Sequence, residues 1–268
     1  MKISRMAAPF LLAATSLAPA WAAVEGYTVV DPFGDTVIDG NVWADQDRIR
    51  GLTGTALRLM QRDVGADTSN SDGTALSWSA ALARPTPVTQ LRGIVRVGAL
   101  DLTNCAANTG YNARVRARLL GTFFNTGVRT TGSNLGDVLA QVWLARSAST
   151  GDAPGVLRVE GWVGVCQDST CQGARQIGTT VALGTANVGD SVTLAVEWDR
   201  AAKTFHFIRD NGAASGAVAY TVNDSTEPSV SFKTVGTRTE VPNCTAARAS
   251  ASIDATFDTI SVNVKARP

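Results

Sequence analysis

The chain has 268 residues, and its 24 Lys and Arg against 23 Asp and Glu give a formal net charge of +1. This balance provides no global electrostatic reason for binding nucleic acid or an anionic membrane. Gly, Ser, Thr, Ala and Val dominate, and amphipathic helical stretches are absent. That composition is typical of many short strands joined by tight turns.

Residues 1–22 have the organisation of a secretory signal peptide. A positively charged start, a short apolar core and a small-x-small cleavage site follow one another, ending at Ala22. The remaining residues, 23–268, are expected to form a single domain. No other segment approaches the roughly 18 apolar residues that a membrane-spanning helix needs. The sequence therefore predicts a secreted or periplasmic protein without a membrane span.

Alternating apolar and polar residues predict a series of short strands through the middle of the chain. The runs are residues 76–82, 95–99, 111–120, 138–144, 157–165 and 179–183. Gly-rich or Ser/Thr-rich connections separate several of them. Spacing of this kind favours a β-sandwich over alternating β/α units.

The four cysteines all follow the signal peptide, and an exported protein favours disulfides. Cys166 and Cys171 flank four residues, a spacing that a disulfide can clip, which leaves Cys105 and Cys244 to pair across the fold. Four cysteines allow three connectivities, so this pairing is a hypothesis from spacing. Zinc is the alternative, but the one histidine, His206, is distant in sequence from these cysteines.

The clearest hairpin signal lies at residues 191–209, where apolar residues alternate on both sides of a polar turn. The apolar positions are Val192, Leu194, Val196 and Trp198 before the turn, and Phe205 and Phe207 after it. This pattern predicts two antiparallel strands joined by a short loop. Such a hairpin needs strands on either side and a second sheet beneath it.

Three groups of residues resemble motifs of the concanavalin A-like superfamily of lectins and glucanases. They are an opening Asp31-x-Phe33, Ile38-Asp39 and Trp43, the Val-Glu-Trp-Asp and Lys-Thr-Phe-x-Phe hairpin at residues 196–207, and a closing Phe-Asp-x-Ile-x-Val at residues 257–262. The resemblance spans about residues 28–264. It implies an all-β jelly roll, a sandwich of two antiparallel sheets with the first and last strands close together. It does not imply one activity.

One face of the middle strands carries the residues that a sugar-binding sheet requires. The candidate contacts are Trp143, Trp162, Arg116, Arg158 and Glu160, which alternate with apolar residues along their strands. Indole rings stack on the apolar faces of sugars, while guanidinium, amide and carboxylate groups bind hydroxyls or uronates. We therefore predict a non-catalytic module that binds a polysaccharide or cell-surface glycan. An ordinary solvated face is the alternative, and a register slip of one residue would invert the assignment for any strand.

Two other functions stay open. The Glu-x-Asp-x-Glu strand of laminarinase-type glycosidases is absent, but Glu160 and Glu197 would form a degenerate hydrolytic pair if they faced each other. A structural or adhesive surface protein is the third reading. No cofactor is predicted. Residues 67–73 offer oxygen ligands for calcium, although Ser79 stands where an EF-hand-like loop has its Glu, and a plain Asx-rich turn is the alternative.

Overall fold

The computed structural model describes residues 47–68, 72–106, 110–245 and 247–263, all of which fall in one compact unit. The predicted signal peptide and the opening motif at residues 31–43 lie outside the described residues. The regular secondary structure of the described residues is made up of strands and one short 3₁₀ turn, Asp210–Gly212. It contains no helix long and apolar enough to cross a membrane.

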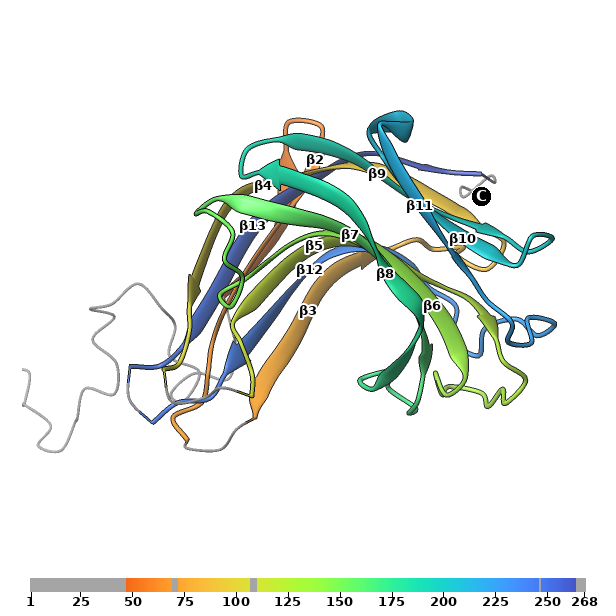
Figure 1. Ribbon diagram of the computed structural model, residues 1–268, viewed down its shortest axis with the longest axis horizontal. Coiled ribbons are helices and arrows are strands. Elements are labelled where there is room, and N and C mark those ends of the chain that lie inside the picture. Colours follow the sequence, from red (N-terminus) through yellow and green to blue (C-terminus); the bar gives the residue numbers. More distant parts are fainter. Residues whose placement is uncertain (1–46, 69–71, 107–109, 246, 264–268) are drawn as a thin grey trace, which may run out of the picture. The chain divides into compact units, whose positions relative to one another are not determined.

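Seven strands form the first antiparallel sheet, in the order β1-β2-β13-β4-β9-β10-β11 (Figure 1). Their bounds are β1 Asp47–Thr53, β2 Ala56–Val64, β4 Gln90–Thr103, β9 Ser191–Asp199, β10 Thr204–Arg209, β11 Ala214–Ala219 and β13 Ser250–Val262. The predicted hairpin is confirmed as β9 and β10, with Val196 opposite Phe207 and Trp198 opposite Phe205.

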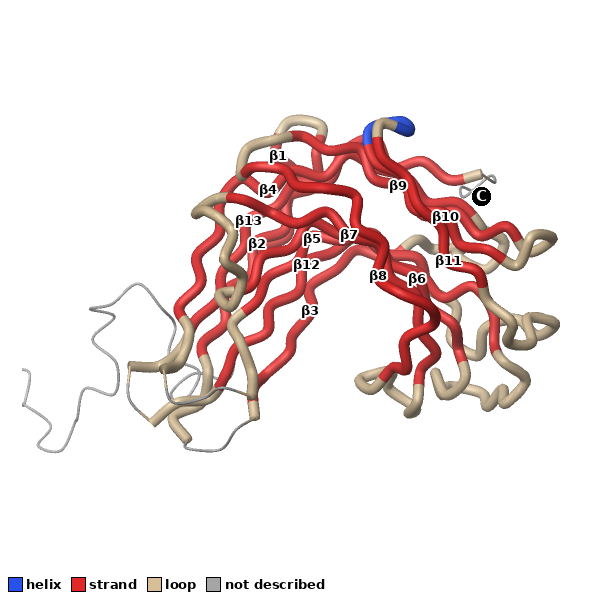
Figure 2. The backbone as a smooth tube through the Cα atoms, viewed as in Figure 1, coloured by secondary structure: helices blue, strands red, loops and turns tan. Residues whose placement is uncertain are grey.

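Six strands form the second antiparallel sheet, in the order β3-β12-β5-β6-β7-β8. Their bounds are β3 Gly73–Ala81, β5 Arg114–Asn125, β6 Asp137–Ser147, β7 Val156–Cys166, β8 Ala174–Asn187 and β12 Lys233–Pro242. Figure 2 shows how completely strands account for both layers. The predicted all-β sandwich is confirmed, and its two antiparallel sheets fit the concanavalin A-like arrangement that the motifs resemble.

The core lies between the two sheets and is built by the apolar positions that the alternation predicts. Phe205 and Phe207 of β10 are fully buried, as are Val115 and Leu119 of β5. Burying a side chain of this size contributes about 1.5–3 kcal/mol. Because successive strand residues point to opposite faces, each buried residue leaves its neighbours on the outer face of its sheet. This alternation places the polar residues of β5, β6 and β7 together outside the core.

Two disulfides join parts of the described chain. Cys105 is bonded to Cys244, which links the end of β4 to the segment between β12 and β13. Cys166 is bonded to Cys171 at the end of β7. This is the connectivity that the cysteine spacing suggested.

Candidate functional site

A groove of about 950 Å³ lies on the outer face of the six-stranded sheet. Four of the five predicted contacts line it, namely Trp143, Trp162, Arg116 and Glu160. They come from β5, β6 and β7, which are consecutive in the chain and adjacent in the sheet. The groove is also lined by the residues Arg114, Arg118, Gln141, Arg238 and Glu240.

The fifth predicted contact, Arg158, is outside the groove lining. It precedes Glu160 by two residues on β7, but its Nε lies 2.7 Å from a carboxylate oxygen of Asp152 in the preceding loop. Nearly half of the Arg158 side chain, 48%, is exposed. Sequence alternation assigned the face of this residue, but only the loop geometry shows which partner it takes.

Trp143 is held beneath two arginines. Its indole Nε1 donates a hydrogen bond to Glu160 (3.0 Å), and the guanidinium groups of Arg116 and Arg114 lie 5.1 and 5.8 Å from the ring centroid. Only 4% of Trp143 is exposed. Its ring is therefore a platform that orients the arginines through cation–π contacts, and little of it is free to stack on a ligand.

Trp162 is the indole that the groove presents. The residue is half-buried, and its ring lies over the backbone of Gly164 on the same strand. A Cβ added at Gly164 would be 2.1 Å from Cη2 of that ring. The glycine thus lets the indole lie against the floor of the groove, with part of the ring accessible to a flat ligand.

Arg238 and Glu240 of β12 complete the charged floor of the groove. Oε1 of Glu240 lies 3.2 Å from a guanidinium nitrogen of Arg116 and 2.9 Å from Nε of Arg238. Burial lowers the pKa of Arg116 to about 10, an effect that Glu240 partly offsets. One carboxylate oxygen therefore serves two cations.

Sequence reasoning did not single out Arg238 and Glu240, and the reason lies on the other face of β12. Thr237 and Thr239 point into the core but are polar, so the strand lacks the apolar alternation that marks β5, β6 and β7. These threonines are satisfied by Gln61 of β2 across the sandwich, through hydrogen bonds of 3.1 and 2.8 Å. The sequence signal that could have identified Arg238 and Glu240 is their alternation with Thr237 and Thr239, which marks a strand even though both of its faces are polar.

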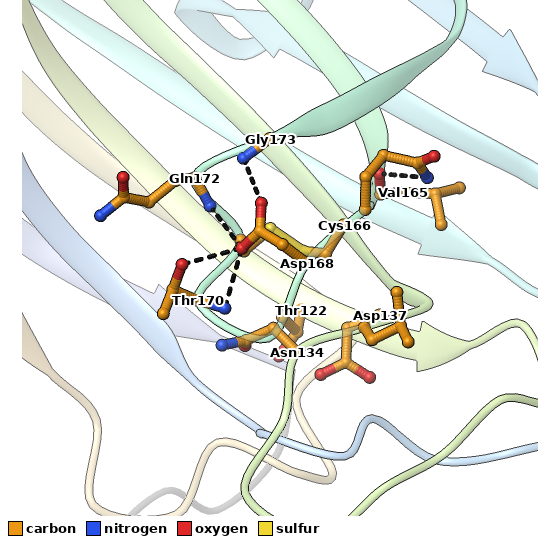
Figure 3. The surroundings of a disulfide bond; sticks show 12 residues. Thr122, Asn134, Asp137, Val165, Cys166, Asp168, Thr170, Gln172 and Gly173 are labelled. Atoms are coloured by element: carbon orange, nitrogen blue, oxygen red, sulfur yellow. Dashed lines mark hydrogen bonds between the residues drawn. A yellow bond between two sulfur atoms is a disulfide. The ribbon is translucent and has the colours of Figure 1, made fainter.

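The loop closed by the Cys166–Cys171 disulfide forms one border of the groove, to which Thr170, Cys171 and Gln172 contribute. Figure 3 shows the Asp168 carboxylate inside this loop, accepting hydrogen bonds from its own backbone. The donors are the amides of Thr170, Gln172 and Gly173, joined by the Thr170 hydroxyl. These hydrogen bonds, that from Gly173 first, lower the pKa of Asp168 to about 2.

The carboxylates proposed as a hydrolytic pair are not brought together. Glu160 lines the groove of the six-stranded sheet, whereas Glu197 belongs to β9 of the other sheet and lines a separate hollow with His206. Glu197 and His206 are direct cross-strand neighbours there. The pairing of Glu160 with Glu197 was wrong because alternation defines a face of a strand but not the sheet to which that strand belongs.

Glu240 is the second carboxylate in the groove lining. Glu160 contacts the Trp143 indole and Arg114, and Glu240 contacts Arg116 and Arg238.

The candidate calcium segment, residues 67–73, is described only in part, because residues 69–71 lie outside the described ranges. Elsewhere in the described chain, no three His, Cys, Asp or Glu residues are grouped so that they could hold a metal ion.

No protein-family model and no curated protein matches this sequence. Similar solved structures include SCP-B, a member of the eqolisin family of peptidases, with 11% identity over 73% of this chain and 82% of that chain, at a TM-score of 0.40. Alginate lyase from Alteromonas sp. 272 has 11% identity over 75% and 95%, at 0.34. The exoplasmic/lumenal domain of VIP36, bound to Ca²⁺ and Man3GlcNAc, has 11% identity over 82% and 84%, at 0.31. Such low identities and scores carry no conclusion about function.

Proposed function

We propose that this protein is an exported, non-catalytic module that binds a polysaccharide or cell-surface glycan in the groove of its six-stranded sheet. One observation carries the proposal. A half-buried indole, several guanidinium groups, an amide and two carboxylates line a single groove of about 950 Å³. Flat ring faces and fixed polar groups in one depression are what recognition of a sugar requires.

Trp162 and Gln141 supply the two kinds of contact. The accessible part of the Trp162 ring offers an apolar surface for stacking, and Gln141 is fixed beside it with its Oε1 accepting a hydrogen bond from Arg118 (3.1 Å). Gln141 is directly opposite Trp162 in the β6–β7 pair. A sugar on the indole therefore meets a guanidinium and amide pair that is already oriented, which reduces the entropy lost on binding.

Export is supported by two disulfides in the described chain and by the signal-peptide organisation of residues 1–22. A disulfide that borders the groove requires a compartment in which it stays oxidised. We therefore place the glycan in the periplasm or outside the cell.

The test is retention of the purified protein on immobilised polysaccharides, with competition by the free sugar. The informative variant is Trp162→Ala, which should weaken binding by about tenfold or more, the equivalent of about 1.4 kcal/mol. Trp143→Phe is its comparison, because Phe keeps a platform for Arg116 while the groove keeps its exposed indole. Retention on no polysaccharide would overturn the proposal. Concentration-dependent self-association without sugar affinity would then favour the structural or adhesive reading.

A further inference from the structure

Arg118 is a buried cation without a carboxylate partner. Only 7% of the residue is exposed, on the floor of the groove. Its guanidinium donates hydrogen bonds to Oε1 of Gln141 (3.1 Å) and to Oγ of Ser77 (2.8 Å), both of which are neutral. Among the described residues no carboxylate lies within ion-pair distance of Arg118, and Glu240, which pairs with Arg116 and Arg238, acts on it only through its charge. Burial, reinforced by Arg238 and Arg116 and partly offset by Glu240, lowers the pKa of Arg118 to about 9.

The groove as a whole carries excess positive charge. Four arginines line it, Arg114, Arg116, Arg118 and Arg238, against the two carboxylates of Glu160 and Glu240, so the balance is 4 − 2 = +2. The whole protein is nearly neutral, at +1. The positive charge is therefore concentrated where a ligand would bind, and low-dielectric walls strengthen its field.

A second arginine has an unused donor in the same place. Nε of Arg116 is buried and has no hydrogen-bond partner among the described residues. The rest of its guanidinium is fixed between Glu240 and the Trp143 ring. A buried donor without a partner is costly, and so is a buried cation with no carboxylate within ion-pair distance. An incoming anion would relieve both.

We propose that the glycan bound in the groove is an acidic polysaccharide, whose oxyanion substituents bind at the arginine cluster formed by Arg116, Arg118 and Arg238. The inference rests on the proposed function and adds the chemical class of its ligand. Guanidinium groups bind carboxylate and sulfate oxygens through paired N–H donors. The neighbouring Trp162 ring adds a surface on which a sugar ring can stack. This feature favours an acidic sugar polymer over a polyanion that has no sugar rings.

Four soluble polymers test the proposal by isothermal titration calorimetry. Polygalacturonate supplies carboxylates and its full methyl ester lacks them; dextran sulfate supplies sulfates and dextran lacks them. We expect one or both acidic polymers to bind at least about tenfold more tightly than the neutral parent, with affinity that falls as salt is raised. The acidic polymer that binds more tightly identifies the substituent. Equal binding of an acidic polymer and its neutral parent would overturn the inference while leaving the proposed function intact.

Two further outcomes separate the claims. Binding of poly-L-glutamate as tightly as the best polysaccharide would overturn the assignment to a sugar polymer. Binding of no polysaccharide at all would overturn the proposed function itself. The three results therefore cannot be confused with one another.

Single substitutions locate the site. Arg118→Gln should lower the affinity for the acidic polymer roughly 10- to 100-fold, as expected for a lost hydrogen bond to a charged group. Arg238→Gln, at a side chain that is 28% exposed, gives the same test where Arg118→Gln fails to fold. Arg96→Gln is the matched control: it removes the same charge from the exposed surface of β4, in the other sheet. Equal losses in all three variants would overturn the assignment to the arginine cluster.

Discussion

The backbone of Arg116 lies directly opposite that of Arg238 where β5 pairs with β12. Like charges at directly opposed positions destabilise a sheet. The conflict is resolved by Glu240, whose Oε1 contacts both guanidinium groups. The floor of the groove is thus built around one carboxylate that holds two arginines in place while leaving their sum positive.

Glu240→Gln should lower the free energy of unfolding by about 2 kcal/mol, because it leaves two largely buried cations without their shared counter-charge. The same change raises the charge of the groove by one unit, so affinity for an acidic polysaccharide should rise. Urea unfolding and calorimetry measure the two effects. Glu227→Gln, at an exposed residue, is the control. A variant as stable as the wild type would contradict the role given to Glu240.

Gly164→Ala should displace the Trp162 indole, because the new Cβ would overlap the ring. The ring can move into the groove, so we expect a small loss of stability, about 1 kcal/mol, together with weaker glycan binding and altered tryptophan fluorescence. Gly151→Ala is the matched control, since a Cβ there meets nothing within 4 Å. Unchanged glycan affinity in Gly164→Ala would show that the position of the indole is irrelevant to binding.

Asp168→Asn should loosen the loop that borders the groove, because an amide replaces one of the two oxygens that accept hydrogen bonds. Hydrogen exchange at the amides of Thr170, Gln172 and Gly173 should accelerate, with the disulfide still closed. Asp190→Asn, which acts on the separate turn at Asn187, should leave these three amides unchanged. In the wild type the hydrogen bonds should persist in acid, since the lowered pKa of Asp168 keeps its carboxylate ionised down to about pH 2.

Lys233→Met should remove a pH dependence of stability on the alkaline side. Lys233 is fully buried, its Nζ contacts the Thr122 carbonyl and the Phe123 ring, and burial lowers its pKa from 10.5 to about 8. Between these values the unfolded chain binds more protons than the folded one, so the contribution of Lys233 to stability rises with pH. Below about pH 8 Lys233 is charged in both the folded and the unfolded state, and the cost of burying that charge lowers the free energy of unfolding by its full amount, roughly 3 kcal/mol.

The measurement is the stability difference between Lys233→Met and the wild type, followed from pH 7 to pH 10.5. We expect the advantage of the variant to shrink as pH rises. A constant difference would show that Lys233 keeps its ordinary pKa in the folded protein. Taking the difference cancels the titration of tyrosines, which both proteins share.

Local alternation predicted one face for Arg116, Trp143, Arg158, Glu160 and Trp162, and the structure brings all of them except Arg158 into one groove. It worked because β5, β6 and β7 form a meander, so neighbours in sequence are neighbours in the sheet. The same reasoning failed for Glu197, since β9 belongs to the other sheet. Sheet membership depends on pairings between distant segments, such as β12 with β5, that a period of two does not encode.

The exposure and the contacts of each side chain also could not be predicted from the sequence. Trp143 and Trp162 have the same place in their strand patterns, yet one is covered by arginines and the other lies open over a glycine. The difference arises from the neighbours on adjacent strands. Arg158 likewise takes its partner, Asp152, from a loop whose path the sequence does not specify.

Gly161 and Gly164 have a joint consequence for β7. A Cβ at Gly161 would strike the Phe207 ring in the core, and one at Gly164 would strike the Trp162 ring in the groove. An aromatic ring therefore packs against the backbone of β7 on each of its two faces, at positions three residues apart. Neither position can therefore take a side chain larger than hydrogen without displacing the Phe207 ring in the core or the Trp162 ring in the groove.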